Sequence, residues 1–543
     1  MKLKLPIGIQ TFKKLRENNC VYVDKTKYLV DLIENVDVCF FARPRRFGKS
    51  LTISTFEALF SGEKELFKGL AAEEFLYRHD FKPHPVISLN MSDITTNKGL
   101  DAIEESICTL TNKVARNLKI KLSNTKFPGD LFSELITSTA EKYNQKAVIL
   151  IDEYDMPYTE FVNDPDMAEK VRDLLRNFYS RIKSNDKDIR FVFITGISKF
   201  TKMGVFSSLN NLVDISPDEQ YGEMCGYTEA EIIKYLPEYL DETANEFGIT
   251  VDELVEKMRE YYNGFCFDFG GKHRLYNPFS TLCFFQKKKF LDFWFESGTP
   301  AVIAKYLKTK KITVEQFRNV SVSKDLIYNS VEIEKAVPEN FLFQTGYLSL
   351  RPGTVNDFSL DYPNAEVLNS MSKLATQNIL HDNNEDYTYC RNDLLNALIT
   401  MDYDMVVNVF NRLLASIPYD DFSAAANQNV YINSYKFPPR EWLYRSTILA
   451  FLRGCGVVVI AEMHTNSGRA DLVLAHKGKT WVIEIKVAYK GESPAKKADE
   501  ALRQIIDRNY AKPYRDAFCM GFAIKDSIRQ ITDARAQHFL LKE

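Results

Sequence analysis

The sequence lacks the paired cysteines that would mark a zinc site or a disulfide framework. Its nine cysteines are scattered, with no Cys-x-x-Cys pair and no histidine at ligand spacing. It also lacks any apolar run approaching the about 18 residues of a membrane-spanning helix, and its first residues hold no apolar stretch long enough for export. We therefore expect a protein of the reducing cytoplasm that has no membrane partner.

Internal repeats and low-complexity linkers are missing as well. Hydrophobic residues make up 45% and charged residues 26% of the chain, which leaves no room for wholesale disorder. The 543 residues exceed what one hydrophobic core usually supports, so we expect two or three folded domains.

Neither sign of charge dominates the whole chain, but one end is basic. The net charge is −3, whereas Val430–Glu543 holds 19 Lys and Arg against 12 Asp and Glu, or +7, which leaves −10 for the rest. Because phosphate neutralisation dominates nucleic-acid binding, this asymmetry points weakly to a C-terminal module that faces nucleic acid. A solvated, lysine-rich surface explains the charge equally well.

Phe40–Leu51 is an apolar run that breaks into a basic loop ending in Gly48, Lys49 and Ser50. A buried strand, a turn with glycine and a helix with exposed first N–H groups form a site that attracts phosphate. Lys49 would reach the terminal phosphates and the Ser50 hydroxyl would hold Mg²⁺. The motif expects a further glycine where Arg43 stands. The candidate binding residues of this loop are Arg45, Arg46, Phe47, Gly48, Lys49, Ser50 and Leu51.

A second run of aliphatic residues, Ala147–Ile151, ends in the acids Asp152 and Glu153. Because the carboxyl ends of parallel strands meet in one crevice, Asp152 can lie beside the phosphate loop and hold Mg²⁺, and Glu153 can polarise the attacking water. Taken alone, the pattern is more typical of a buried strand followed by an acidic helix cap. Its pairing with the upstream loop favours a nucleotide site.

A further buried strand, Arg190–Gly196, ends in the small polar residue Thr195, which we expect to sense a γ-phosphate. The helix before it carries Arg172, Arg176 and Arg181, any of which could supply charge in the transition state. Most helical arginines are merely solvated, so we assign none of them this role.

These segments together resemble the bacterial AAA-ATPase-like family. The resemblance covers roughly residues 5–280 and lies in Tyr22–Thr26, Arg43–Leu51, Leu150–Asp155 and Thr195-Gly196. The family commonly replaces the first glycine of the loop, so Arg43 looks like a family trait. Aromatic-rich segments within residues 225–285 also resemble the family and imply a small helical lid. The region from about residue 286 to 425 is expected to be mainly helical, with no catalytic constellation.

The C-terminal region predicts a hairpin in which two carboxylates face each other. If residues 476–479 form the loop, Ala475 pairs with Thr480, and the same register places Asp471 opposite Glu484. Side chains alternate along a strand, so Lys486 shares the face of Glu484. Such acids repel one another unless a divalent cation lies between them. An exposed ribbon with ordinary cross-strand pairs is the simpler alternative.

Helices flank this hairpin on both sides in the chain. The upstream helix could lend Glu441 as a further carboxylate, and the downstream helix, Ala498–Tyr510, presents polar groups. Helix, hairpin and helix in this order resemble the PD-(D/E)XK nuclease superfamily over about residues 430–535. Asp471, Glu484 and Lys486 fall on its three signature positions, which implies metal-dependent cleavage of a phosphodiester.

The sequence thus predicts an α/β protein with a P-loop NTPase domain, a helical lid, a helical middle and an α/β nuclease-like domain, at residues 1–224, 225–285, 286–425 and 426–543. We expect ATP and Mg²⁺ as cofactors, with Mn²⁺ as an alternative in the nuclease centre, where Asp471 and Glu484 are the metal ligands. The expected partner is nucleic acid, DNA in the first place; a homo-oligomer stays open. Two alternatives stay open as well: a nucleotide-switched scaffold without turnover, and, ranked lower, a DNA-translocating motor.

Overall fold

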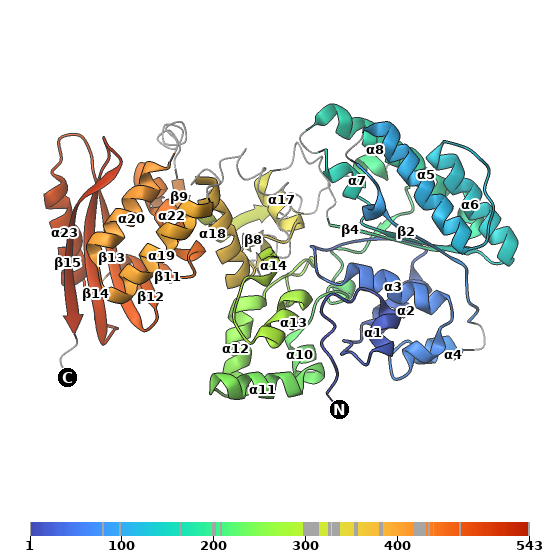
Figure 1. Ribbon diagram of the computed structural model, residues 1–543, viewed down its shortest axis with the longest axis horizontal. Helices are drawn as coiled ribbons and strands as arrows, with labels where there is room; N and C mark the ends of the chain where they lie inside the picture. Colours follow the sequence, from blue (N-terminus) through green and yellow to red (C-terminus); the bar gives the residue numbers. More distant parts are fainter. Residues whose placement is uncertain are drawn as a thin grey trace. The chain divides into compact units, whose positions relative to one another are not determined.

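A computed structural model describes the chain except for residues 1, 79–80, 97–98, 162–163, 198–201, 207–208, 297–313, 324–326, 328–336, 352–356, 380–383, 418–429, 433–434, 438, 466–467 and 541–543. The chain forms two compact units (Figure 1). The first unit joins Met1–Gly298 with Asn319–Glu366, and the second joins Thr299–Arg318 with Val367–Glu543. The finer division into four domains stays a prediction.

A five-stranded parallel sheet organises the first unit, in the order β2-β3-β4-β1-β5. Its strands are β1 (Val38–Ala42), β2 (Val86–Asn90), β3 (Ala147–Asp152), β4 (Ile189–Gly196) and β5 (Val213–Asp214). Every residue of β1 and β3 is buried, as expected for strands covered on both faces. The predicted parallel sheet is confirmed.

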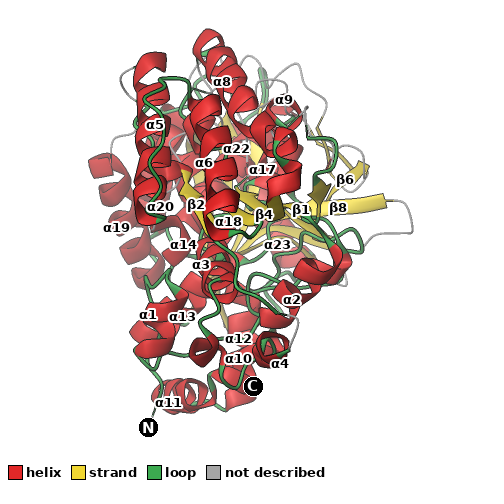
Figure 2. Cartoon of the chain, turned by 90° about the vertical axis from the view of Figure 1, so that its right-hand side faces the viewer, coloured by secondary structure: helices red, strands yellow, loops and turns green. Residues whose placement is uncertain are grey.

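Helices cover both faces of this sheet (Figure 2). On one face lies α3 (Lys49–Phe60), whose Phe56 and Phe60 stack against Phe191 of β4. The neighbouring helices are α1 (Phe12–Glu17), α2 (Thr26–Asn35) and α4 (Glu73–Tyr77). The other face carries α5 (Leu100–Asn117), α6 (Pro128–Tyr143) and α8 (Pro165–Ser184), together with the short α7 (Met156–Thr159) and α9 (Lys202–Val205).

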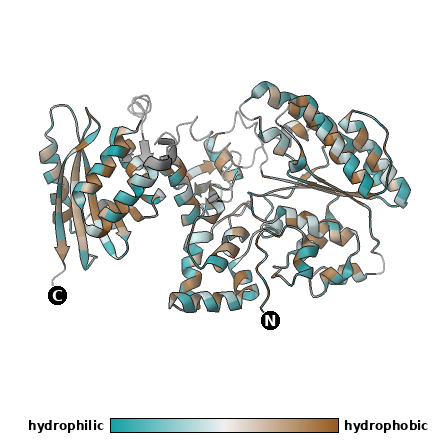
Figure 3. Cartoon of the chain, viewed as in Figure 1, coloured by the Kyte–Doolittle hydropathy of each residue, from teal (hydrophilic) through white to brown (hydrophobic). Residues whose placement is uncertain are grey.

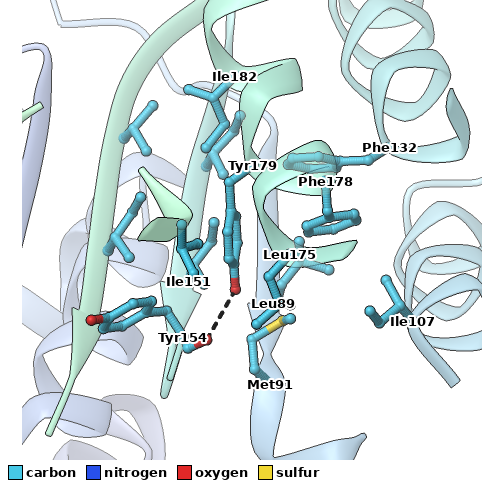
Figure 4. Close-up of a cluster of buried hydrophobic side chains, with 14 of the residues drawn as sticks. Leu89, Met91, Ile107, Phe132, Ile151, Tyr154, Leu175, Phe178, Tyr179 and Ile182 are labelled. Carbon is cyan, nitrogen blue, oxygen red and sulfur yellow. Dashed lines mark hydrogen bonds between the residues drawn. The ribbon is translucent and has the colours of Figure 1, made fainter. Parts of the chain in front are cut away.

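One core lies between the sheet and α5, α6 and α8 (Figure 4). There Phe132 of α6 stacks on Phe178 of α8 with ring centroids 4.4 Å apart. The Tyr179 hydroxyl donates a hydrogen bond of 3.3 Å to the carbonyl of Tyr154, directly beyond β3. This bond ties helix α8 to the carboxyl end of the sheet. In Figure 3 the strands of this sheet are mostly brown, whereas the helices around them carry both teal and brown residues.

A helical subdomain follows, as the sequence predicts for the lid. Its helices are α10 (Glu229–Tyr235), α11 (Pro237–Phe247), α12 (Val251–Tyr262), α13 (Pro278–Lys287) and the short α14 (Phe293–Glu296). Helix α10 starts with a capping box, in which the side chains of Thr228 and Glu231 accept hydrogen bonds from each other's backbone N–H groups. Helix α12 starts in the same way at Thr250.

The middle of the chain is helical and also holds a small antiparallel sheet that the sequence did not predict. Its order is β6-β8-β7, formed by β6 (Val320–Ser323), β8 (Asp357–Asp361) and β7 (Ser349–Arg351). Helix α17 (Pro338–Gln344) precedes β7, and α18 (Ala365–Ile379), α19 (Asn384–Thr400) and α20 (Tyr403–Ala415) follow β8.

The second unit is built on a mixed sheet in the order β11-β12-β13-β14-β15. The strands are β11 (Val458–Thr465), β12 (Gly468–His476), β13 (Lys479–Ala488), β14 (Asp516–Lys525) and β15 (Gln530–Leu540). Only β13 and β14 pair in parallel, through the crossover helix α23 (Pro494–Asp507). The remaining elements are α22 (Pro439–Gly454) and the hairpin β9 (Val430–Ile432) with β10 (Tyr435–Phe437).

Two cores sandwich the central strand β13. Ile483, Ile485 and Val487 face α19, α20 and α22, while Val482 faces α23. Side chains of β13 therefore alternate as predicted. No helix among the described residues is long and apolar enough to cross a membrane. All nine cysteines lie in described positions and are free thiols.

Candidate functional site

The basic loop connects β1 to α3 at the carboxyl edge of the parallel sheet. Gly48 is the N-cap of α3 and adopts a left-handed backbone with φ of 101°, which favours glycine. The helix begins at Lys49, so its first N–H groups border the loop. This is the geometry of a phosphate-binding helix terminus.

Lys49 is buried inside the loop. Its ammonium donates hydrogen bonds of 2.9 and 3.0 Å to the carbonyl oxygens of Arg43 and Pro44. Burial lowers the pKa of Lys49, and the charges of Asp152, Glu153 and Asp155 oppose that shift. The loop lysine and the acids at the end of β3 and just beyond it are thus close enough to interact electrostatically.

Strand β4 lies between the two halves of this site. Its Thr195 is fully buried and pairs with Phe41 of β1, and its hydroxyl oxygen has no hydrogen-bond partner among the residues that the structure describes. Glu153 has a left-handed backbone with φ of 52°, which is rare outside glycine and is frequent at functional sites. Burial raises the pKa of the Glu153 carboxyl, and the nearby Lys49 opposes the shift.

The residues present fit a nucleoside triphosphate with Mg²⁺. A buried ammonium that bonds only loop carbonyls can exchange them for phosphate oxygens, and the unpartnered Thr195 hydroxyl supplies a further polar group. Asp152 is 4% exposed at the end of β3, and Ser50 lies in the first turn of α3. Hydroxyl and carboxylate oxygens are the ligands that Mg²⁺ prefers.

The other predicted loop residues have distinct positions. Arg45 and Arg46 are exposed, and the Arg46 guanidinium lies 4.7 Å from the ring centre of Phe279. Phe47 is buried against Phe265 of the lid, with ring centroids 5.0 Å apart. Leu51 is partly exposed on α3. The side chain of Phe47 thus joins the loop to the lid and does not point to solvent.

The C-terminal hairpin has the predicted register. Ala475 pairs with Thr480, and the ladder runs to Leu472 opposite Ile483, so Asp471 comes next opposite Glu484. The turn is tighter than the expected four-residue loop, because His476 still pairs with Lys479. Lys477 and Gly478 both have positive φ, 45° and 78°, as a type I′ turn requires.

At the end of this ladder each of the two carboxylates accepts a hydrogen bond from a backbone N–H of the opposite strand. The Asp471 backbone N–H donates to Glu484 Oε2 at 3.3 Å, and Asp471 Oδ2 accepts from the Ile485 N–H at 2.8 Å. Arg445 of α22 contacts Asp471 Oδ1 at 3.2 Å. Lys486 Nζ lies 3.3 Å from Glu484 Oε1, so the three signature residues share one face.

Glu484 is the most deeply buried member of this group, with 2% of its surface exposed. Burial first, and then the Asp471 carboxylate, raise the pKa of Glu484, while Lys486 opposes the shift. Ionising Glu484 is thus costly even with Lys486 beside it, because burial is the larger effect. Paired carboxylate oxygens suit a hard divalent cation such as Mg²⁺ or Mn²⁺.

Gln504 of α23 donates a hydrogen bond to Glu484 Oε1. The helix reaches the carboxylate because the strand residue beside Glu484 is Gly521, where a Cβ would lie 2.3 Å from the backbone nitrogen of Leu502. Sequence reasoning noted a polar helix here but gave Gln504 no role. The small residues Ala501 and Gly521, which lie against each other, are the signal that could have pointed to it.

Glu441 is not brought into the carboxylate pair. It lies one helical turn before Arg445 on α22, and its charge contributes to a raised pKa of Tyr489, directly beyond β13, where burial is the larger cause. The described part of the chain holds no group of three or more His, Cys, Asp or Glu residues that could bind a metal. Arg445 occupies the contact with Asp471, and sequence reasoning missed it.

Comparisons with known proteins agree with both types of domain. The family model described as "Predicted AAA-ATPase" matches residues 6–206, and the PD-(D/E)XK nuclease superfamily model matches residues 439–532. The fold and sites therefore define a P-loop ATPase-like protein with a nuclease-type domain, and the chain belongs to the AAA-ATPase-like family. A protein of Azotobacter chroococcum mcd 1, described as "Uncharacterized protein in vnfD 5'region", is 34% identical over 520 residues, 94% of each chain.

Proposed function

We propose that this protein is an ATP-controlled nuclease that uses a divalent metal to cleave DNA. The observation that carries the proposal is the arrangement of Asp471, Glu484 and Lys486 on one face of the hairpin. The second support is the burial of Lys49 in the basic loop, where the charges of Asp152, Glu153 and Asp155 act on it. We expect the protein to act in the cytoplasm.

In the nuclease centre, Asp471 and Glu484 would hold Mg²⁺ or Mn²⁺. The ion supplies a Lewis acid and a more acidic water when it is bound. Lys486 is aimed at the same carboxylate and can orient the attacking water or stabilise the charge that develops on the phosphate. Gln504 keeps Glu484 in its rotamer, and Arg445 does the same for Asp471.

In the nucleotide site, Lys49 and the first N–H groups of α3 would bind the β- and γ-phosphates. Ser50 and Asp152 would hold Mg²⁺, which would balance the charge of the phosphates. Glu153 would orient and deprotonate the attacking water. Thr195 would detect the γ-phosphate through its buried hydroxyl.

A scaffold that binds nucleotide and metal without turnover is the main alternative. The contact between Arg445 and Asp471 favours it, because a buried cation can replace the metal at this carboxylate. A translocating motor has no such specific support. Turnover rates for ATP and for a cleaved substrate separate these readings.

The nuclease is tested by incubating the full chain with plasmid, linear duplex, single-stranded DNA and RNA, in Mg²⁺ or Mn²⁺, with and without ATP. Asp471→Ala should abolish cutting. Asp499→Ala is the matched control, because Asp499 forms a partly exposed ion pair with Arg535 on the same domain. Equal cutting by Asp471→Ala, or no cutting of any substrate, would contradict the proposal.

The nucleotide site is tested by titrating MgATP into the wild type and Lys49→Ala. We expect the variant to bind at least about tenfold more weakly, because a hydrogen bond to a charged group contributes about 1.5–3 kcal/mol. Lys183→Ala, on the exposed side of α8, is the control. Unchanged affinity in Lys49→Ala would refute the assignment of the loop.

A further inference from the structure

Arg43 stands where a phosphate loop ordinarily has its first glycine, and its side chain points away from solvent. It is 1% exposed. Its guanidinium donates to the carbonyls of Ala42 at 2.9 Å, Ser216 at 2.8 Å and Tyr221 at 3.3 Å. It also lies over the ring of Phe267, 5.0 Å from the ring centre. The side chain therefore joins the start of the loop to the chain beyond β5 and to the lid.

Such a guanidinium is expensive to bury. Its hydrogen bonds go to main-chain carbonyls, and burial lowers the pKa of Arg43 to about 10. Desolvating a charge costs several kcal/mol unless its donors find well-placed acceptors. A glycine here would avoid that cost entirely, so the arginine needs a benefit that pure stability does not supply.

The main chain of Arg43 connects the contacts of its guanidinium to the phosphate site. Its carbonyl accepts a hydrogen bond of 2.9 Å from Lys49, the residue expected to bind phosphate. Its N–H donates at 3.3 Å to the carbonyl of Gly196, the neighbour of Thr195. The position of one backbone thus affects both the loop lysine and the end of β4.

The lid grips the same loop at two further points. The Gly226 N–H donates to the Phe47 carbonyl at 3.3 Å, and Trp294 Nε1 donates to the Arg45 carbonyl at 3.3 Å. Phe47 itself packs edge-on against Phe267, the ring that also contacts Arg43. Phe267 of the lid therefore contacts two residues of the loop, Arg43 and Phe47, and a movement of the loop reaches the lid through this ring.

We infer that Arg43 is a positioning residue that fixes the phosphate loop to the lid. When Lys49 leaves the Arg43 carbonyl, Arg43 transmits that change to residues 216–221 and 226–285. This inference rests on the proposed nucleotide site. Phosphate oxygens that attract Lys49 release the carbonyl of Arg43, and the guanidinium passes that change to the carbonyls of Ser216 and Tyr221. The arginine is thus part of the nucleotide response, and the loop has not decayed from the glycine motif.

One substitution separates this inference from the view of a degenerate motif. Arg43→Gly restores the usual first glycine and would improve nucleotide binding in a decayed loop. If Arg43 positions the loop, the same change weakens MgATP binding about tenfold or more, because the carbonyls of Ser216 and Tyr221 lose charged donors. Arg43→Lys keeps the charge and one bond, so it should fall between the wild type and Arg43→Gly.

The experiment measures MgATP affinity of the full chain by calorimetry well below its unfolding temperature, together with hydrogen exchange of residues 216–221 and 226–285 with and without nucleotide. We expect nucleotide to protect both segments in the wild type and to leave them unprotected in Arg43→Gly. A further variant, Arg43→Met, removes the charge from a side chain of similar length. Its control is Arg78→Met, which removes an arginine from a partly exposed ion pair with Glu34. A purely structural arginine would lower the unfolding temperature without changing affinity.

The outcomes are distinct. Wild-type protein that binds no ATP overturns both the proposed function and this inference. Wild-type binding with equal or tighter binding by Arg43→Gly overturns the inference alone. Weakened binding with full nucleotide protection of residues 216–221 and 226–285 also contradicts it.

Discussion

The two sites have opposite charge patterns. In the first unit a buried cation, Lys49, experiences the charges of Asp152, Glu153 and Asp155, and burial lowers its pKa. In the second unit a buried anion, Glu484, is surrounded by the donors Lys486 and Gln504, and burial raises its pKa. Each central group is charged only at a cost, which a ligand of the opposite sign reduces. A ligand of the opposite sign, phosphate for Lys49 and a metal cation for Glu484, is what we propose for each site.

The largest expected effect is that of replacing Glu153, which should separate ATP binding from ATP hydrolysis in the first site. Glu153→Gln keeps the size of the side chain and removes the base, so ATP hydrolysis should fall by about 10²–10⁴-fold, the usual contribution of general-base catalysis. ATP affinity should change little, because Lys49 and Ser50 remain. Steady-state hydrolysis and equilibrium titration check this pair of expectations. Equal loss of affinity and rate would mean that Glu153 only shapes the site.

The next effect tests whether helix α23, which lies outside the β12–β13 pair, contributes to the second site. Gln504→Leu removes the donor to Glu484 Oε1 and should weaken Mn²⁺ binding and slow cleavage by about 10–100-fold, as the loss of an outer partner of a metal ligand does. Glu500→Gln on the exposed side of α23 is the control. Mn²⁺ titration and cleavage rates measure both effects, and an unaltered Mn²⁺ affinity in Gln504→Leu argues against the assigned role.

The smallest effect is a dependence of stability on pH with opposite sign in the two sites. The pKa of Glu484 rises from 4.5 to about 8, so the folded metal-free protein binds more protons than the unfolded chain in this window. Its contribution to the free energy of unfolding therefore falls as pH rises through that range. For Lys49, whose pKa is lowered from 10.5, the contribution rises as pH increases toward 10.5.

Glu484→Gln makes this measurable. The stability gain of the variant over the wild type should grow as pH rises through the Glu484 window, when urea unfolding is followed in EDTA by circular dichroism. Lys49→Met should give a gain that shrinks as pH rises toward the ordinary lysine pKa. Differences that stay constant with pH would contradict the reversed charge patterns of the two sites.

Much of both sites follows from local patterns in the sequence. The expected four-residue loop and the observed two-residue turn both pair Ala475 with Thr480, and in that register strand period two places Asp471, Glu484 and Lys486 together. The parallel sheet likewise places the ends of β1, β3 and β4 at one edge. Such local rules hold because both strand pairs are central and buried.

Other features depend on contacts that leave no local trace. The partners of Arg43 are the main-chain carbonyls of Ser216 and Tyr221, and any residue offers a carbonyl. Gln504 reaches Glu484 only because α23 packs closely on Gly521 of another strand. The small sheet of β6, β7 and β8 has strands too short to show periodicity.

The most direct test of the central claim is the rate of DNA cleavage by the wild type, Lys49→Ala and Lys183→Ala, each with no nucleotide, ATP or ADP at a fixed Mg²⁺ concentration. The account predicts that ATP changes the rate of the wild type and of Lys183→Ala, and that Lys49→Ala cleaves at a nucleotide-independent rate. Cleavage by the wild type that is indifferent to ATP, or a response to ATP that survives in Lys49→Ala, would contradict control of the nuclease by the phosphate loop.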